Sequence, residues 1–393
     1  MRIVFIADLH IGSSNTYGVT DYNTGLNTRE LDVLKNLDQA IDFILEPKNK
    51  IDLFVILGDL YEDRRPTMTQ QREFAKRIAR LSEQKKDVLI LKGNHDSYEG
   101  EGLAHTSAVI QELKVPYVTI IDEPQLVHYD NLAIIAIPYV SQRRMRLKTV
   151  EEAITYYDNT VKTLRSQSGS QQNICIAHQV VENAIMSAGY RDLSTFEEFV
   201  VSLKIFKDFD ITICGHIHKY QPLQKTPPVL YVGSLDRVDF GEAREDKGFV
   251  LYDSDKKDIK FAKFNSIREF LSLELDVSVN NVDIQRQVET FLEKKDFKGK
   301  ITKFTVRIRE EDIIYVDALQ INRLLKDVFY FKGVSYDVVK IKRARNEEIK
   351  ETLSPTQALE SFINSKEEYK NLASKMIEVG KEIIREAEET IIT

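Results

Sequence analysis

Eight polar residues follow five short apolar runs along the first two-thirds of the chain, and their side chains are those of metal ligands and acid–base groups. They are Asp8, His10, Asp59, Asn94, His95, His178, His216 and His218. Five of the seven histidines of the chain are among them. The set offers imidazole nitrogen, carboxylate oxygen and amide oxygen without thiolate, a combination that suits Mn, Fe or Zn.

Without His95, seven candidate ligands remain, which are too many for one tetrahedral ion but enough for two ions of higher coordination that share a bridging carboxylate. Two such metals about 3.5–4 Å apart hold the attacking and leaving oxygens of a phosphoryl displacement and acidify a bound water. Hydroxide is then the nucleophile, so this chemistry needs no Ser or Cys.

The apolar runs are the elements that must position these residues. Runs of this length, rich in Val and Ile, are typical of buried strands. We therefore predict strands over residues 2–7, 51–57, 88–92, 173–177 and 210–214. Residues just past such strands gather at one edge of an open α/β sheet. His216 and His218 occupy alternate positions, so an extended backbone would point both imidazoles the same way.

Each piece has a simpler explanation when it is taken alone. Asp8-X-His10 can arise by chance, and Gly58-Asp59 is typical of a turn. Residues 93–96 (GNHD) are typical of a loop with local hydrogen bonds, and a lone His178 is typical of a partly buried, hydrogen-bonded histidine. Five such segments in this order, each after a strand, favour a metal centre over these alternatives.

These segments resemble the signature blocks of the calcineurin-like metallophosphoesterases, and in particular the SbcD family of nuclease subunits of double-strand-break repair complexes. The family-level similarity lies in residues 58–66 (GDLYEDRRP) and 232–242 (VGSLDRVDFGE). The resemblance covers about residues 1–250. It implies an α/β fold, with a metallophosphoesterase β-sandwich flanked by helices, then a small α+β cap domain and a C-terminal helical tail.

The resemblance also implies two divalent metal ions, with Mn²⁺ expected and Fe, Zn or Mg as alternatives. It assigns one metal to Asp8, His10 and His218 and the other to Asn94, His178 and His216, with Asp59 bridging the two. His95 is not a ligand in this pattern; it stabilises charge on the phosphate or protonates the leaving oxygen.

Two further positions near these blocks bear on the site. We expect Asp96 to orient an imidazole, which fixes its tautomer and basicity. The family usually has His at the position of Glu62. This departure leaves the metal centre intact but bears on how DNA is positioned, or on the balance of exonuclease and endonuclease action.

The function implied by the resemblance is a DNA nuclease with 3′-to-5′ exonuclease action on duplex ends and endonuclease action on single strands or hairpins. An SbcC-type coiled-coil ATPase is the expected partner, and a homodimer is expected through residues 66–84 or the segment after Asp96. One alternative is a metallophosphoesterase acting on a phosphoprotein or small phosphodiester, which would need neither a cap nor a long tail. A non-catalytic scaffold is a third hypothesis, and the intact ligand set disfavours it.

Length and composition agree with a large enzyme outside the membrane. The 393 residues can hold two or three domains, and no apolar run approaches the roughly 20 residues of a membrane span. Residues 2–7 already form a strand that leads to Asp8, where a signal peptide would destroy the site, so we expect a cytoplasmic protein. Cys175 and Cys214 lie in predicted buried strands, and we expect reduced core thiols rather than a disulfide.

The net charge of −7 differs from that of a stand-alone DNA-binding protein, because phosphate contacts supply most non-specific affinity. Basic residues gather in 141–148 (SQRRMRLK), in 340–345 (KIKRAR) and at Arg64 and Arg65. Each cluster taken alone is more often a solvated face than a nucleic-acid contact. The overall acidity suggests that a partner contributes much of the affinity for DNA.

The rest of the chain predicts further units. Strands over 249–252 and 259–261 close the nuclease domain, which spans residues 1–265. Strands over 271–277, 301–308 and 336–341 alternate with helices over 282–293 and 318–328, which indicates a small α+β cap over 266–345. From 346 to 393 we predict a helical region that begins with Ser354 as N-cap. Its apolar stripe is expected to dock on the ATPase partner, or else on the cap.

Overall fold

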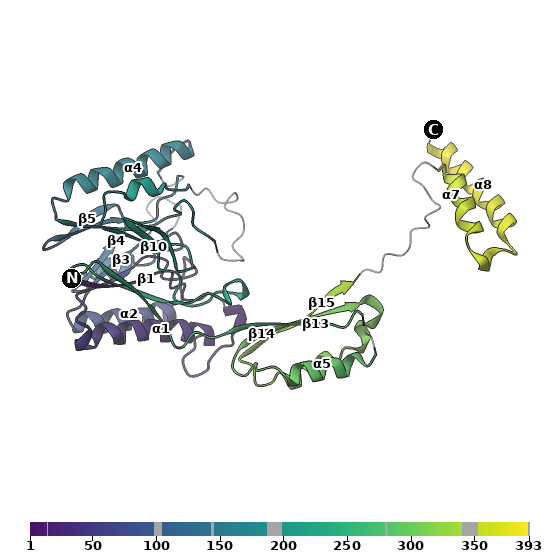
Figure 1. The fold of residues 1–393 in the computed structure, drawn as a ribbon, viewed down its shortest axis with the longest axis horizontal. Coiled ribbons are helices and arrows are strands. Elements are labelled where there is room, and N and C mark those ends of the chain that lie inside the picture. The colour runs from purple at the N-terminus through teal and green to yellow at the C-terminus, as the bar shows by residue number, and fades with distance from the viewer. Residues whose placement is uncertain are drawn as a thin grey trace. The chain divides into compact units, whose positions relative to one another are not determined.

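The computed structural model describes residues 1–13, 15–97, 104–142, 145–186, 199–279, 282–339 and 353–391. Two six-stranded mixed sheets pack face to face in the first two-thirds of the chain, with helices on both outer faces (Figure 1). The predicted α/β fold, a β-sandwich flanked by helices, is confirmed.

The first sheet has the order β12-β11-β1-β2-β3-β4, and the second has the order β5-β6-β7-β8-β10-β9. The strands of the first sheet are β1 (Arg2–Ile6), β2 (Leu53–Ile56), β3 (Asp87–Leu91), β4 (Val118–Ile121), β11 (Gly248–Asp253) and β12 (Asp258–Lys263). Those of the second are β5 (Gln125–Tyr129), β6 (Leu132–Ile137), β7 (Gln172–His178), β8 (Ile211–Gly215), β9 (Gln221–Lys225) and β10 (Pro228–Tyr231).

The strands that carry the predicted site residues are parallel to their neighbours. β1, β2 and β3 run parallel in the first sheet, and β7 and β8 run parallel in the second. All five predicted strands are present, and each boundary lies within two residues of the prediction. The carboxyl ends of parallel strands meet at one edge, so the segments that follow them are brought together.

Three apolar layers hold the sandwich together. Val4, Ile6 and other residues on one face of the first sheet pack against helices α1 (Thr28–Leu45) and α2 (Met68–Glu83). Ile3 and Phe5, on its other face, pack against the second sheet, for example at Ile134. The outer face of the second sheet packs against helix α4 (Val150–Gln167). Strands buried on both faces explain why their sequences are continuous apolar runs rather than alternating ones.

Helices α1 and α2 begin with capping boxes, at Asn27 with Glu30 and at Thr67 with Gln70. In each box two backbone N–H groups of the first turn are hydrogen-bonded by side chains, which favours the helix start. The helices of this part of the chain are α1 (Thr28–Leu45), α2 (Met68–Glu83), α3 (Ala108–Glu112) and α4 (Val150–Gln167).

A buried ion-pair network ties α1 to the segment that follows β10. Arg29 is fully buried, and its guanidinium donates to Asp32 Oδ2 at 2.5 Å, to Asp236 Oδ2 at 2.9 Å and to the Arg237 carbonyl at 2.9 Å. Arg268 donates to the same Asp32 carboxylate at 2.7 Å. A buried cation is stable only with such partners, so this network fixes α1 against the rest of the domain.

The remaining strands form a third sheet of order β13-β14-β15. Its strands are β13 (Phe270–Asp276), β14 (Ile301–Arg309) and β15 (Tyr330–Val339), with helices α5 (Ile284–Glu293) and α6 (Ala318–Leu324) between them in sequence. The strand–helix–strand–helix–strand order is therefore as predicted. β15 begins six residues earlier than predicted, because pairing with β14 extends it through Lys332 and Gly333, which are not typical strand residues.

By its internal contacts the chain divides into two compact units. One comprises residues 1–275, 288–305 and 317–335, and the other comprises residues 276–287, 306–316 and 336–393. The predicted domain boundaries after residues 265 and 345 stay predictions.

The tail forms a helical hairpin of α7 (Pro355–Asn364) and α8 (Ala373–Ile391). Ser354 caps α7 as predicted: its hydroxyl accepts from Gln357 N–H at 3.3 Å, and Gln357 Oε1 accepts from Ser354 N–H at 3.0 Å. A Cβ at Gly380 would lie 2.4 Å from a Leu359 methyl carbon, so the glycine lets the two helices pack closely.

Cys175 and Cys214 are buried free thiols on adjacent strands, in agreement with the expectation of reduced cysteines. Burial raises the pKa of both thiols, which keeps them protonated and unreactive. None of the described helices is both long enough and apolar enough to cross a membrane.

We predict that Arg29→Met lowers the free energy of unfolding by about 3–5 kcal/mol, because it leaves the Asp236 carboxylate buried without its cation. Denaturant unfolding followed by circular dichroism measures the change. Arg80→Met is the matched control: Arg80 pairs with Asp42 at 2.6 Å with both side chains well exposed, so it should cost less than about 1 kcal/mol. Equal losses in the two variants would contradict a stabilising role for the network.

Candidate metal centre

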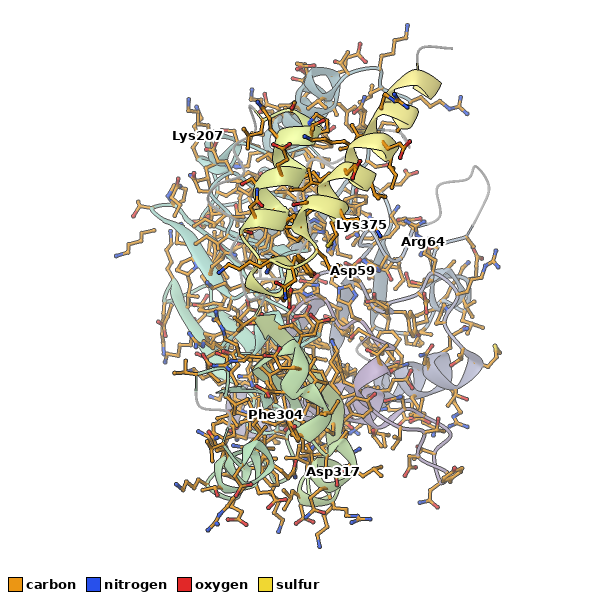
Figure 2. The ribbon with its side chains drawn as sticks, turned by 90° about the vertical axis from the view of Figure 1, so that its right-hand side faces the viewer. Asp59, Arg64, Lys207, Phe304, Asp317 and Lys375 are labelled. Carbon is orange, nitrogen blue, oxygen red and sulfur yellow. The ribbon has the colours of Figure 1, made fainter. Side chains whose placement is uncertain are left out.

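All eight predicted site residues lie together at the carboxyl ends of β1, β2, β3, β7 and β8. Six of them are buried, and Asn94 and His95 are half-buried. Asp59, which follows β2, is labelled in Figure 2 together with Arg64 on the exposed loop that comes after it. The structure therefore brings together every residue that the sequence selected.

His10 and His218 form the first group of donor atoms. Their Nε2 atoms face each other at 3.0 Å, and their ring centroids are 4.8 Å apart. Asp59 Oδ2 lies 3.6 Å from His10 Nε2. The ring of His95 stands edge-on to His10, with centroids 4.7 Å apart. Two imidazole nitrogens and one carboxylate oxygen thus point into a common space beside His95.

The second group is built around the Asn94 amide oxygen. Asn94 Oδ1 lies 2.9 Å from His178 Nε2 and 3.0 Å from His216 Nδ1. Asp59 Oδ2, the same oxygen that approaches His10, lies 3.2 Å from His178 Nε2. One carboxylate oxygen is therefore shared between the two groups of donors, which is the arrangement of a bridging ligand.

Asp8 contacts the second group of donors. Both of its carboxylate oxygens accept the His216 backbone N–H, at 2.8 and 3.0 Å, and Oδ1 lies 3.8 Å from His178 Nδ1. Asp8 is fully buried. Its described contacts are with the second group, and none of them is with the His10 or His218 ring.

Four of the predicted residues have backbone dihedrals that non-glycine residues rarely adopt. The φ angle is +50° at Asp8, +45° at His10, +53° at Asp59 and +94° at His216. Such conformations cost free energy and persist only where the surroundings enforce them, typically at functional sites. Here the sharp turns after the strands aim each side chain inward.

Two glycines make room for this packing. A Cβ on Gly93 would lie 2.1 Å from Asp59 Oδ1, and a Cβ on Gly58, where φ is +96°, would lie 2.6 Å from His178 Nδ1. The Gly-Asp and Gly-Asn-His-Asp segments therefore need glycine because the backbone passes against the predicted ligands.

The expectation for Asp96 is wrong in detail. Its carboxylate contacts no imidazole among the described residues. It accepts instead from the backbone N–H groups of Asp59 at 2.9 Å, Leu60 at 3.2 Å and Gly93 at 2.9 Å, and from the Thr106 hydroxyl at 2.6 Å. Burial and the nearby Asp59 charge raise the pKa of this carboxyl. Asp96 fixes the loops that carry Asp59 and Asn94, not a ring.

His95 is held by two hydrogen bonds, one through its backbone N–H and one through its ring. Its backbone N–H donates to Asp59 Oδ1 at 2.8 Å, and its Nδ1 lies 2.7 Å from the Glu62 carbonyl oxygen. Because a carbonyl can only accept, Nδ1 must carry a proton. Nε2 then presents a lone pair, or a second proton when the ring is charged.

The ionisation of the centre follows from its mixture of charges. Burial alone would raise the pKa of Asp59 and lower that of His178. Their mutual attraction outweighs burial, so the pKa of Asp59 falls well below its ordinary value and that of His178 rises to about 9. Further imidazoles around Asp59 act in the same direction. The site therefore keeps its central carboxylate ionised.

Tyr139, Glu242 and Lys247 also surround the centre, although sequence reasoning gave them no role there; Glu62, which the sequence marked as a departure from the family, lies there too. Glu242 Oε1 lies 2.8 Å from His218 Nδ1, and Tyr139 lies beside His216 with ring centroids 6.1 Å apart. The signal for Glu242 was present in residues 240–242 (FGE) as a family feature. Tyr139 follows β6 without any distinguishing pattern.

The donor set fits two divalent metal ions. Ligands at right angles on a metal with bonds of about 2.1 Å lie about 3 Å apart. The His10–His218, Asn94–His178, Asn94–His216 and Asp59–His178 separations are all 2.9–3.2 Å. Nitrogen and oxygen donors without thiolate suit Mn, Fe or Zn and do not select one of them.

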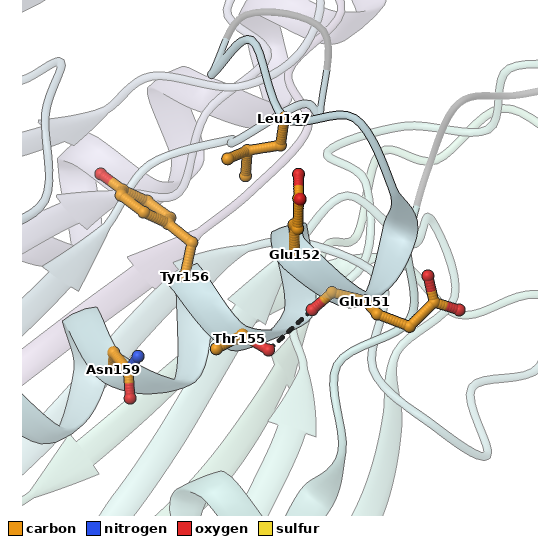
Figure 3. Close-up of a pocket in the computed structure, with 6 residues that line it drawn as sticks. All are labelled: Leu147, Glu151, Glu152, Thr155, Tyr156 and Asn159. Atoms are coloured by element: carbon orange, nitrogen blue, oxygen red, sulfur yellow. Dashed lines mark hydrogen bonds between the residues drawn. The ribbon is translucent and has the colours of Figure 1, made fainter.

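Two hollows lie on the surface of this domain. One lies on α4 and is lined by Leu147, Glu151, Glu152, Thr155, Tyr156 and Asn159 (Figure 3). Its lining holds two carboxylates and no Lys or Arg, which disfavours phosphate. The other lies beside the centre, because Lys219 follows His218 and Gly241 precedes Glu242. It is lined by Ile185, Met186, Lys219, Tyr220, Gly241, Arg244, Glu245 and Asp246.

Residues 1–220, more than half of the chain, match the calcineurin-like phosphoesterase family, and the chain belongs to this family. It is therefore a metal-dependent phosphodiesterase, as the sequence predicted. The chain is 23% identical to the SbcD subunit of the nuclease SbcCD of Staphylococcus epidermidis over 77% of this chain and 79% of that protein. It is 24% identical to the DNA double-strand break repair protein Mre11 of Methanocaldococcus jannaschii over 86% of this chain and 93% of that protein.

The corresponding SbcD protein of Staphylococcus saprophyticus is 22% identical over 93% of both chains. The similarity to the SbcD family is thus confirmed over nearly the whole length. Among solved structures, a cold-active protein-tyrosine phosphatase of a psychrophilic Shewanella aligns with a TM-score of 0.27 and 14% identity, over 66% of this chain and 80% of that one.

We predict that Gly93→Ala abolishes binding of the second Mn²⁺ ion, because the added carbon would displace the Asp59 carboxylate. Equilibrium dialysis with metal analysis counts the ions bound per chain. Gly169→Ala is the control: Gly169 also has positive φ, but a Cβ there meets nothing within 4 Å. Full metal occupancy in Gly93→Ala would show that the close approach does not position Asp59.

Proposed function

We propose that this chain is a two-metal DNA nuclease that acts in double-strand-break repair or DNA end processing. The observation that carries the proposal is the shared Asp59 Oδ2 atom, 3.2 Å from His178 Nε2 and 3.6 Å from His10 Nε2. The names of the relatives, a nuclease subunit and a break-repair protein, support DNA as substrate.

The proposed ligand assignment follows the two groups of donors except at Asp8, which is assigned as the resemblance implies although its described contacts are with the His216 N–H and His178. One metal is held by Asp8, His10 and His218, the other by Asn94, His178 and His216, and Asp59 bridges them. When bound, the metals would acidify water and stabilise the charge that develops on the phosphate. We propose Mn²⁺ as the working ion, since nitrogen and oxygen donors accommodate it.

His95 is the proposed catalytic residue. Three contacts support this role: the ring lies edge-on to His10, its Nδ1 is hydrogen-bonded to the Glu62 carbonyl, and its backbone N–H is hydrogen-bonded to Asp59. A histidine in this position can donate a proton to the leaving oxygen or stabilise negative charge on the phosphate. Neither role requires His95 to bind a metal.

The DNA-contacting surface is proposed to include the hollow next to His218. Lys219 and Arg244 supply cations there, and neither has an ion-pair partner in the described part of the chain. The two carboxylates of the same hollow are each paired with a lysine, Glu245 with Lys247 and Asp246 with Lys263. Arg64 and Arg65 lie on the exposed loop after Asp59. Of the basic cluster 141–148, Arg143 and Arg144 lie outside the described residues, as does the whole of 340–345.

The finer features of the proposal are 3′-to-5′ exonuclease action on duplex ends, endonuclease action on single strands or hairpins, a homodimer, and a cytoplasmic location. Exposed apolar side chains at Met68, Val109 and Leu113 support the two segments suggested for the dimer surface. The net charge of −7 supports a partner that shares the binding of DNA.

The proposed partner is an SbcC-type coiled-coil ATPase, bound by the tail. One face of α8, with Ala373, Ile377, Gly380 and Ile384, is partly buried in the hairpin. The neighbouring stripe of Leu372, Met376, Val379 and Ile383 stays exposed, at 61%, 37%, 49% and 60%. A helix with such a stripe is suited to a groove between partner helices.

The nuclease activity is tested with a linear duplex labelled at one end, the full chain and Mn²⁺. We expect the labelled strand to be shortened, and we expect EDTA to stop the reaction. His95→Asn should lower the rate by at least about 100-fold, because a proton donor contributes about 10²–10⁴. The control is His128→Asn, an exposed histidine on β5, which should cleave at the wild-type rate.

Cleavage by His95→Asn at the wild-type rate would contradict the assigned role of His95. Intact DNA, with bis-p-nitrophenyl phosphate still hydrolysed and no gain on adding the ATPase, would instead favour the small-phosphodiester or phosphoprotein alternative.

Docking of the tail is tested by the affinity of the full chain for the purified ATPase. Val379→Glu places a charge in the exposed stripe, so we expect the dissociation constant to rise about tenfold or more. Ser374→Glu adds the same charge at an exposed position outside the stripe and should have little effect. Equal binding by both variants would place the contact elsewhere.

A further inference from the structure

The hollow that includes Lys219 and Tyr220 lies directly beside the metal centre. Lys219 is the residue after His218, and Gly241 is the residue before Glu242, whose Oε1 lies 2.8 Å from His218 Nδ1. The hollow has a volume of about 420 Å³, which falls in the range of about 300–1,000 Å³ that is usual for small-molecule sites. It is therefore large enough to receive a part of the substrate next to the predicted metals.

Close backbone packing fixes the part of the hollow that follows His218. The His218 carbonyl accepts from the Ser234 N–H at 2.9 Å and from Lys247 Nζ at 2.8 Å. Gly233 has a φ of +84°, and a Cβ there would lie 2.7 Å from the Tyr220 backbone nitrogen. The backbone of Tyr220 is thus held in a fixed place beside the centre.

Tyr220 contributes an aromatic ring to the lining of the hollow. Its ring is stacked on that of Phe261, with centroids 3.9 Å apart and an interplanar angle of 13°. Tyr220 is only half-buried in spite of this contact. A ring that is held rigidly and still reaches a surface hollow is a suitable partner for a nucleic-acid base, because every base has a π face.

A buried glutamine holds the apolar part of the hollow in place. Gln221 is 7% exposed. Its Oε1 accepts from the Ile185 N–H at 2.9 Å, and its Nε2 donates to the Ile185 carbonyl at 2.9 Å. Ile185 is nevertheless 60% exposed, and Met186 beside it is half-buried. Fixed apolar side chains that line a hollow are typical of a ligand site.

The charge that the hollow offers depends on which of its ions are already paired. Both carboxylates of its lining form an ion pair with a lysine, at 2.9 and 2.7 Å. Lys219 and Arg244 have no ion-pair partner among the described residues. The hollow therefore presents two uncompensated cations, which attract phosphate.

The hollow on α4 shows that size and an aromatic ring do not by themselves make such a site. Its volume is about 410 Å³, and Tyr156 lies in its lining (Figure 3). Its charged residues are Glu151 and Glu152, so a phosphate would be repelled there. Two hollows of nearly equal size thus differ in the sign of their charge, and only the one beside the centre fits an anion.

The lining favours an unpaired nucleotide over a segment of intact duplex. Cations can bind the phosphates of either form. Apolar and aromatic side chains gain little from a duplex backbone, because the faces of its bases are stacked inside the helix. An unpaired nucleotide offers a base and a phosphate together, and the apolar, aromatic and cationic groups of this hollow match both.

We infer that this hollow binds one unpaired nucleotide of the DNA strand, with its base against Tyr220 and Ile185 and its phosphate at Lys219 and Arg244. The inference rests on the proposed function, since the strand brings the nucleotide to the centre. At least one nucleotide beside the predicted metals must then leave the duplex when DNA binds.

The test compares two labelled single strands of equal length, oligothymidylate and an abasic strand with the same phosphates but no bases. Fluorescence anisotropy measures their dissociation constants with the full chain in EDTA, where nothing is cleaved. The wild type should prefer oligothymidylate. Tyr220→Leu should weaken oligothymidylate binding by about fivefold or more, the effect of losing one base–aromatic stack, and leave the abasic strand unchanged. Tyr220→Phe keeps the ring and should keep the preference.

Arg244→Gln tests the phosphate contact and should weaken both strands to the same extent. Two variants serve as matched controls. Tyr156→Leu removes the ring of the other hollow, and Lys207→Gln removes an exposed cation outside both hollows. Each control should bind both strands as the wild type does.

A wild type without preference for oligothymidylate, or the same preference in Tyr220→Leu, would overturn the inference. Thymidine monophosphate that binds as tightly as the strand would also overturn it, because the ligand would then be a free nucleotide. If Tyr220→Leu does not fold, Arg244→Gln decides, and unchanged binding of both strands overturns the inference. The proposed function is judged separately, by Mn²⁺-dependent cleavage of the end-labelled duplex, and it would stand in each of these cases.

Discussion

The Asp59 carboxylate lies between two groups of imidazoles, and the surrounding loops keep it there. Its backbone is in the left-handed region at φ +53°, with its N–H bound by Asp96. One carboxylate oxygen receives the His95 N–H at 2.8 Å, and the other is the atom shared between His10 and His178. Gly93 passes so close that no side chain fits. The two donor groups form one centre because this carboxylate cannot move away from either of them.

The sandwich supplies the frame for that constraint. Asp59 and Asn94 come from the first sheet, while His178 and His216 come from the second, so the centre joins the two sheets at their carboxyl edge. Apolar packing between the sheets fixes the distance between their edges. Buried ionic networks around Arg29 and Lys247 hold the segment from Ser234 to Lys247 against α1 and His218. Rigid packing allows several strained turns to be maintained in one small region.

Strand positions and donor types could be predicted from the sequence, because buried parallel strands are continuous apolar runs and the candidate ligands follow them directly. Contacts between side chains that are distant in the sequence could not be predicted from it. Glu242 reaches His218 across 24 residues, and Asp96 binds backbone rather than a ring, which depends on loop conformation alone. The apolar spacing in the sequence predicted an amphipathic helix in the tail. Only the folded hairpin shows which apolar residues of α8 pack on α7 and which stay exposed. The sequence marked Glu62 as a departure from the family, but its contact with His10, at 2.9 Å between Oε2 and Nδ1, needed the structure.

The central claim is that one Asp59 carboxylate bridges two metal ions. Electron paramagnetic resonance of the chain loaded with two equivalents of Mn²⁺ tests it most directly, because ions that share a bridging ligand are magnetically coupled. We predict a coupled two-manganese spectrum in the wild type that is lost in Asp59→Asn. Two uncoupled Mn²⁺ signals in the wild type, or a coupled spectrum that survives in Asp59→Asn, would contradict the claim.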